Sequence, residues 1–119
     1  MMNKEEINKI IQKIKEDSKY FITLDESMRN NYDIAINAVA SNGKLLQYLN
    51  DELRGDREIA LAALKNNGCS LEFLSQEFKN DKQLVLVALS ESVYSLEYAS
   101  QELRADSRIK NNSSNLFKP

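Results

Sequence analysis

The pattern of apolar and polar positions in this chain repeats every 25 residues, without insertion or deletion. The copies read LLQYLNDELRGDREIALAALKNNG from Leu45, SLEFLSQEFKNDKQLVLVALSESV from Ser70 and SLEYASQELRADSRI from Ser95. A weaker copy precedes them and ends at Asn42-Gly43. Self-similarity at such a period is the sequence signature of a solenoid.

Each repeat is predicted to form two short helices. In the copy that starts at Leu45, apolar residues recur at an i, i+3, i+7 spacing in the first half, at 46, 49 and 53. In the second half they recur at 59, 60, 63 and 64, which is one face of a second helix. The run LVLVAL at 84–89 would by itself suit a buried strand. Its aligned partner IALAAL at 59–64 is Ala-rich, so both runs are predicted to be helical.

The boundaries of these helices carry local signals. The second helix of each repeat is expected to be capped by an aspartate, namely Asp56, Asp81 and Asp106. We expect Ser70 and Ser95 to cap the first helix. We expect the glycines Gly43 and Gly68 to end the second helix in the left-handed conformation. Positive charge in the last turn of the first helix suits its dipole, at Arg54, Lys79 and Arg104.

The two ends of the chain differ from its middle, as solenoid ends do. A single repeat domain over 1–119 is therefore predicted, an all-α solenoid of 25-residue helical hairpins with about eight short helices. Its parts are a capping helix in 1–19, full repeats at 20–44, 45–69 and 70–94, a partial repeat at 95–109 and a tail at 110–119. The capping helix has one apolar face, formed by Ile7, Ile10, Ile11 and Ile14.

The phrases LEYASQELRAD and DREIALAALKNNG resemble a bacterial and protist repeat family catalogued as domain of unknown function 4116. The resemblance covers about residues 20–109 and departs from the family pattern at Ser92-Val93, where Asn-Gly is usual. It implies a helical-repeat fold and no particular chemistry.

The composition argues against catalysis. The chain has no His, one Cys and three scattered Gly, so it lacks a histidine-based nucleophile, a cysteine cluster for metal and a phosphate-binding glycine loop. We therefore expect no catalytic, cofactor-binding or metal-binding residues, and we expect that the protein is not an enzyme. The single Cys69 is interpreted as incidental.

Charge and hydropathy bear on the expected partners and the cellular location of the protein. The net charge of −2 gives no general attraction to nucleic acid, which we do not expect as a partner. Apolar runs are too short for a membrane span, and the N-terminus reads MMNKEEINKI, with charges where a signal peptide needs apolar residues. The expected location is cytoplasmic, with no membrane partner.

One aromatic column recurs in the repeats, at Tyr48, Phe73 and Tyr98. Two interpretations stay open: packing between neighbouring helices, or exposed anchors along a groove. The acidic column Glu52, Glu77 and Glu102 is interpreted as a solvated ladder beside cations of neighbouring repeats. Leu116 and Phe117 are the tail residues that could cover the last repeat, and the C-terminal end is the expected site of self-association or partner binding.

These features favour a non-catalytic protein–protein interaction module or scaffold with an unknown protein partner. The alternatives are a small-ligand-binding or enzymatic domain with a polar pocket between repeats, or a nucleic-acid-binding repeat. An open, shallow groove would favour the first, and a deep pocket with convergent charges the second.

Overall fold

The structure, a computed structural model, describes residues 2–109, and within that range every regular element is a helix. Helix α1 (Lys4–Glu16) comes first. A 3₁₀-helix, a one-turn α-helix and a longer α-helix then follow in each of the three full repeats, and the described part of the last repeat has the first two of these elements. The 3₁₀-helices are η1 (Ser18–Thr23), η2 (Gly43–Tyr48), η3 (Gly68–Phe73) and η4 (Val93–Tyr98). The one-turn helices are α2 (Glu26–Arg29), α4 (Asp51–Arg54), α6 (Gln76–Lys79) and α8 (Gln101–Ala105), and the longer ones are α3 (Tyr32–Ser41), α5 (Arg57–Asn66) and α7 (Lys82–Glu91). The predicted all-α solenoid is confirmed.

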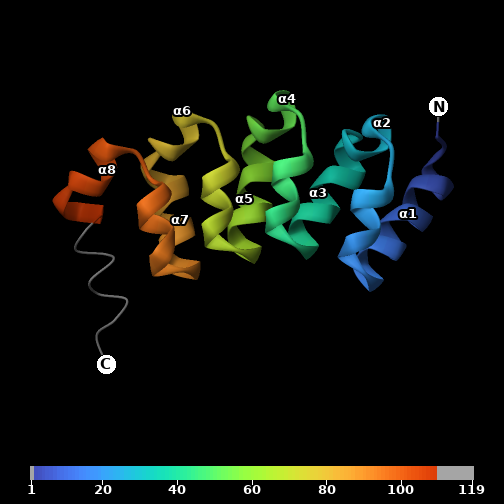
Figure 1. The fold of residues 1–119 in the computed structure, drawn as a ribbon, viewed down its shortest axis with the longest axis horizontal. Coiled ribbons are helices and arrows are strands. Elements are labelled where there is room, and N and C mark those ends of the chain that lie inside the picture. Colours follow the sequence, from blue (N-terminus) through green and yellow to red (C-terminus); the bar gives the residue numbers. More distant parts are fainter. Residues whose placement is uncertain (1, 110–119) are drawn as a thin grey trace.

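The repeats stack in two layers along an elongated body of 48 × 30 × 19 Å (Figure 1). Helices α1, α3, α5 and α7 pack side by side in chain order and form one layer. The 3₁₀-helices η2, η3 and η4 pack on one another and on the α layer. The one-turn helices α2, α4 and α6 lie along one edge of the body (Figure 1). Helix α1 therefore takes the place of the longer helix of a preceding repeat.

The core lies between these layers, on the predicted apolar positions. Ile59, Ala60, Ala63 and Leu64 of α5 are fully buried, and the equivalent residues of α7 are Leu84, Val85, Ala88 and Leu89. The run 84–89 is thus helical, as its alignment with 59–64 predicted. On α1, Ile14 is fully buried, while Ile7, Ile10 and Ile11 are half-buried against the core.

The first half of each repeat is not the single helix that the spacing suggested. In the second repeat, η2 ends at Tyr48 and Leu49 and Asn50 are extended, with ψ of 155° and 171°. The side chain of Asn50 then accepts a hydrogen bond from the Leu53 backbone N–H, which starts a new helix. Ser75 and Ser100 cap α6 and α8 in the same way. Leu46, Leu49 and Leu53 are nevertheless all buried, because the interruption keeps them on one side.

The aspartate caps of the longer helices are present as predicted. The side chain of Asp56 accepts from the Ile59 backbone N–H at 3.0 Å, and that of Asp81 accepts from the Leu84 N–H at 3.0 Å. Asn31 does the same for α3, through the Ile34 N–H. Asp106 accepts from the Arg108 N–H at 2.8 Å.

The predicted caps at Ser70 and Ser95 are wrong. Both serines are fully buried inside 3₁₀-helices, and Asn67 caps η3 through the Cys69 N–H at 3.0 Å. The Ser95 hydroxyl donates back to the Ser92 carbonyl oxygen at 2.7 Å. The helix that contains each serine therefore starts two residues before it, at Gly68 for Ser70 and at Val93 for Ser95.

The predicted left-handed glycines are also wrong, because no glycine among residues 2–109 has a positive φ. Gly43 and Gly68 are instead buried where the start of one 3₁₀-helix meets the next repeat. A Cβ on Gly43 would lie 2.6 Å from the Ala63 carbonyl oxygen, and one on Gly68 would lie 3.1 Å from the Ala88 carbonyl carbon. Glycine is required at these points for close approach of the repeats.

Polar side chains link each repeat to the next at the start of the longer helices. The Tyr32 hydroxyl donates to the Asp56 carboxylate at 3.2 Å, and Arg57 Nη1 donates to the Asp81 carboxylate at 2.9 Å. Lys82 Nζ lies 3.8 Å from the Asp106 carboxylate. The inter-repeat ion pairs of residues 2–109 thus use the capping aspartates, and the expected ladder through the Glu52, Glu77 and Glu102 column is not what joins the repeats.

Candidate interaction surface

The aromatic column lies at the C-terminal ends of η2, η3 and η4. Tyr48 is exposed, at 37% of its surface, while Phe73 and Tyr98 are half-buried and pack against the core. Phe73 and Tyr98 therefore contribute to packing, while Tyr48 is the most accessible ring of the column, and a role as binding anchors stays a prediction. We call Tyr48, Phe73 and Tyr98 the aromatic row.

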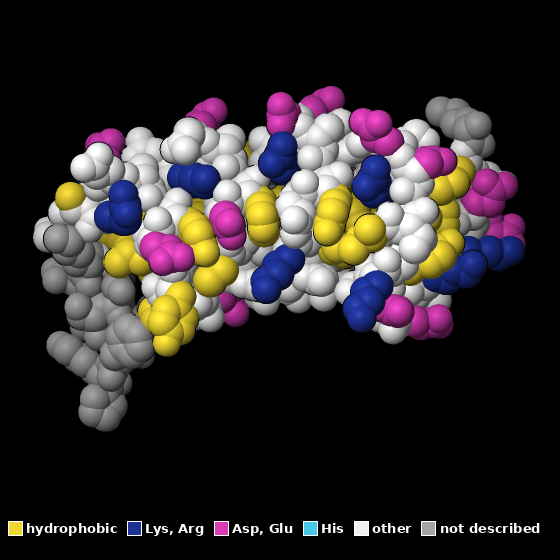
Figure 2. All heavy atoms as spheres, viewed as in Figure 1, with side chains coloured by type: hydrophobic (Ala, Val, Ile, Leu, Met, Phe, Trp, Pro, Cys, Tyr) yellow, Lys and Arg dark blue, Asp and Glu magenta, His cyan; other side chains and the backbone are white. Residues whose placement is uncertain are grey.

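A column of cations runs beside the aromatic row. Its members end or nearly end the one-turn helices, at Arg29, Arg54, Lys79 and Arg104. We call these residues the cation row. Figure 2 shows Lys and Arg side chains in a line along one long face, next to a line of hydrophobic side chains. The recurrence of these cations at 25-residue intervals is the sequence signal that they form a surface row, beyond their favourable place at the ends of helices.

The two rows meet at the junctions between repeats. A shallow hollow of about 170 Å³ is lined by Asp51 and Arg54 from α4 and by Phe73, Leu74 and Ser75 from the following repeat. Arg54 therefore shares the hollow with the aromatic ring and helix-capping serine of its neighbour. The aligned residues are Arg29, Tyr48 and Asn50 at the preceding junction and Lys79, Tyr98 and Ser100 at the next.

Two guanidinium groups of the cation row are incompletely paired. The Nε atoms of Arg29 and Arg54 are buried and have no hydrogen-bond partner in the described part of the chain. Arg54 Nη2 does pair with the Asp51 carboxylate at 2.8 Å, but the Asp51 side chain is 98% exposed. A buried donor without a partner costs free energy. Solvent does not reach these Nε atoms, so an acceptor from outside would have to bind another part of each side chain.

Acidic side chains differ between the two halves of this face. Glu72 and Glu97 are exposed on η3 and η4, whereas the equivalent residues are Ile22 on η1 and Gln47 on η2. The Glu97 carboxylate raises the pKa of the neighbouring Tyr98 phenol to about 12, because its hydrogen bond favours the protonated phenol. Beside the cation row the difference is reversed, because Glu26 and Asp51 of the N-terminal half align with Gln76 and Gln101.

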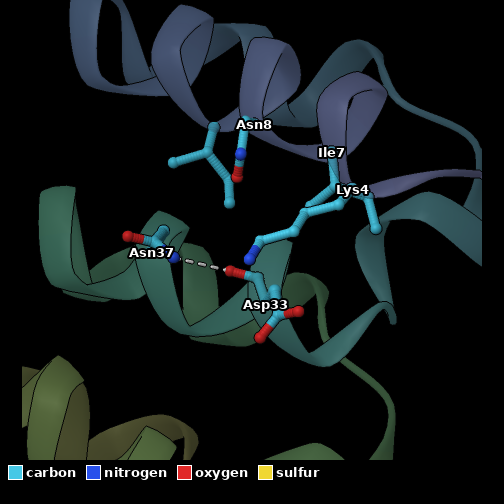
Figure 3. Close-up of a pocket in the computed structure, with 6 residues that line it drawn as sticks. Lys4, Ile7, Asn8, Asp33 and Asn37 are labelled. Carbon is cyan, nitrogen blue, oxygen red and sulfur yellow. Dashed lines mark hydrogen bonds between the residues drawn. The ribbon is translucent and has the colours of Figure 1, made fainter.

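A second hollow lies between α1 and α3 (Figure 3). It has a volume of about 510 Å³ and is lined by Lys4, Ile7, Asn8, Ile11, Asp33 and Asn37. The Asn37 side chain donates to the Asp33 backbone oxygen, and the Lys4 side chain extends toward Asp33 (Figure 3). The hydrogen bond from Asn37 is local to α3, and no cluster of potential metal ligands occurs within residues 2–109.

Other sequence candidates lie elsewhere. Cys69 is half-buried, with its Sγ 3.6 Å from the Ser92 hydroxyl. Leu116 and Phe117 fall outside the described residues, as does most of the tail on which the expected self-association depends. Among residues 2–109, no helix combines the length and apolar character needed to cross a bilayer.

Comparison with known families agrees with this architecture. The model of the family described as domain of unknown function, DUF4116, matches residues 6–54 and 56–104, and the chain belongs to this family. The two matches start two 25-residue periods apart, so one family unit covers two structural repeats. Neither curated proteins nor solved structures gave a match.

Proposed function

We propose that this protein is a non-catalytic protein-interaction module that binds a partner along the surface formed by the aromatic row and the cation row. The observation that supports this most directly is the hollow in which Arg54 of one repeat and Phe73 of the next lie together, in columns that recur every 25 residues. Aromatic and Arg side chains dominate the binding energy of protein interfaces.

The shape of the surface favours a polypeptide partner over a small molecule. The hollow at Arg54 is only about 170 Å³, below the usual size of a small-molecule site, and it lies on a long face that continues over neighbouring repeats. The larger hollow between α1 and α3 is lined by no residue of either row. A cytoplasmic location is part of the proposal, since a single unpaired cysteine suits a reducing compartment.

Peptide display tests this function. A random peptide library is panned on the immobilised chain, and enriched peptides are then measured on Tyr48→Ala and on the control Tyr94→Ala. Tyr94 is 78% exposed but has Lys44 and Cys69 as its aligned residues, so it lies outside the aromatic row. We expect Tyr48→Ala to weaken binding about tenfold or more and Tyr94→Ala to leave it unchanged. Failure to enrich any peptide, or enrichment of peptides indifferent to Tyr48, would refute the proposal.

A further inference from the structure

The spacing and charge of the cation row specify the chemistry of a partner. We propose that the row binds an extended acidic peptide that carries a carboxylate at every third residue, one for each repeat. This inference rests on the proposed function and names its partner class.

The charge argument starts from the incompletely paired arginines. Guanidinium groups form short, charge-assisted hydrogen bonds with carboxylates, often through two N–H groups. Arg29 and Arg54 each keep a buried Nε without a partner, and Asp51, the one carboxylate paired with Arg54, is held at a fully solvated position. A peptide carboxylate at the junction would bind the accessible part of the Arg54 side chain, which is 33% exposed, and displace or join this exposed carboxylate.

The spacing argument starts from helix packing. Adjacent packed helices lie about 8–10 Å apart, and the cation row advances by one member for each packed helix of the α layer. A polyproline II chain rises about 3.1 Å per residue, so three residues span about 9 Å. Carboxylates at i, i+3 and i+6 of such a chain therefore match successive members of the cation row. This conformation also has few internal degrees of freedom to lose on binding.

The neighbouring side chains set the limits of the site. The aromatic row lies beside the cations and offers flat rings for the residues between the carboxylates. Exposed acids on both halves repel a uniformly acidic chain, so the carboxylates of the peptide must be spaced to meet the cations. These acids are Glu26, Asp51, Glu72 and Glu97.

Fluorescence anisotropy with the whole chain tests this proposal. The probe is a labelled (Glu-Pro-Pro)₄ peptide, and the spacing control is a peptide with four consecutive Glu followed by eight Pro, which has the same composition. A (Lys-Pro-Pro)₄ peptide controls for charge. We expect saturable binding of the first peptide with a Kd below about 1 mM at low salt, and binding of each control at least about tenfold weaker.

Variants place the binding on the cation row. Arg54→Gln should weaken the (Glu-Pro-Pro)₄ complex about tenfold or more, and Lys79→Gln provides a second variant that loses no buried guanidinium. Lys65→Gln is the matched control, because Lys65 is an exposed cation in the last turn of α5 in the other layer. Its effect should stay within about twofold.

Several outcomes would overturn the inference: no saturable binding, equal binding of the consecutive-Glu control, or equal effects of the Arg54 and Lys65 variants. Displacement of the peptide by a twelve-residue oligothymidylate at equal concentration would also overturn it, in favour of a nucleic-acid partner. If peptide display enriches Tyr48-dependent sequences without regularly spaced acids, the proposed function stands and only this partner class fails.

Discussion

Replacing Gly68 with Ala tests the close approach between repeats directly. A Cβ at this position would come closer than 3.0 Å to the Ala88 carbonyl oxygen, and it would lie 3.1 Å from the Ala88 carbonyl carbon and 3.2 Å from the Ser92 nitrogen. All three atoms belong to the backbone at the end of α7, so no side chain can rotate away. The start of η3 must therefore move away from α7.

The expected cost follows from two opposing terms. Forcing an extra methyl group into a packed interior costs about 1–3 kcal/mol, and the upper end applies where backbone must move. Replacing Gly with Ala also lowers the entropy of the unfolded chain, which returns about 0.4–1 kcal/mol. The net loss in the free energy of unfolding is thus about 2 kcal/mol, or a fall in Tm of about 8 °C for a domain of this size.

Gly55→Ala is the matched control. Gly55 has a φ of −92°, and the nearest atom to its added Cβ is the Asp51 carbonyl oxygen at 3.3 Å. This substitution should change the free energy of unfolding by no more than about 0.5 kcal/mol, as measured by urea and thermal unfolding with circular dichroism.

A third substitution separates close packing from backbone conformation. If Gly68 were needed for a left-handed conformation, Asn would be tolerated better than Ala at this position. Close packing predicts that Gly68→Asn costs at least as much as Gly68→Ala. A milder effect of Asn, or equal effects of Gly68→Ala and Gly55→Ala, would refute the packing argument.

Three further predictions concern the polar links. Asp81→Ala removes both the cap of α7 and the acceptor of Arg57, so urea unfolding should show a loss of about 1–2 kcal/mol. Asp81→Asn keeps the cap, so its free energy of unfolding should fall by only about 0.5 kcal/mol. If Asp81→Ala and Asp81→Asn lose the same free energy of unfolding, the cap contributes little. The hydrogen bond from Arg57 holds the pKa of Asp81 below its ordinary value of 3.8. The stability that the ionised Asp81 confers is therefore complete above pH 3.8 and is lost as the pH falls through the lowered pKa. Measuring the free energy of unfolding at decreasing pH should show this loss in the parent and not in Asp81→Asn. Glu97→Gln should lower the pKa of Tyr98 from about 12 toward 10, and an unchanged tyrosine difference spectrum on alkaline titration would exclude that interaction.

Much of the fold could be predicted because aligned segments of a repeat share one secondary structure, so a clear copy resolves an ambiguous one. The run 84–89 suits a strand by itself, yet its aligned partner at 59–64 is Ala-rich, and both are helical. The buried faces of α5 and α7 follow from the spacing of their apolar residues, because any helix over these segments places those residues on one face. The aspartate caps are local as well, because Asp56 and Asp81 each bond to an N–H three residues away.

The candidate site could be predicted only in part. The aromatic row was visible as a column, but its degree of exposure depends on how η2, η3 and η4 pack on their neighbours. The hollow shared by Arg54 and Phe73 joins residues of two repeats, and no local pattern reports that contact. The unpaired Nε atoms depend in turn on the burial of those arginines.

The sequence by itself determined the number and period of the repeats, the helical class and the family, because these depend on local spacing and on recurrence. Only the tertiary structure decided why Gly43 and Gly68 are glycines, which residues join adjacent repeats and how the first half of each repeat divides. These features depend on distances between segments about 25 residues apart, as for Gly68 against Ala88 and Arg57 against Asp81. A glycine has the same local signature at a left-handed turn and at a crowded contact, and only the approach of a second backbone distinguishes them.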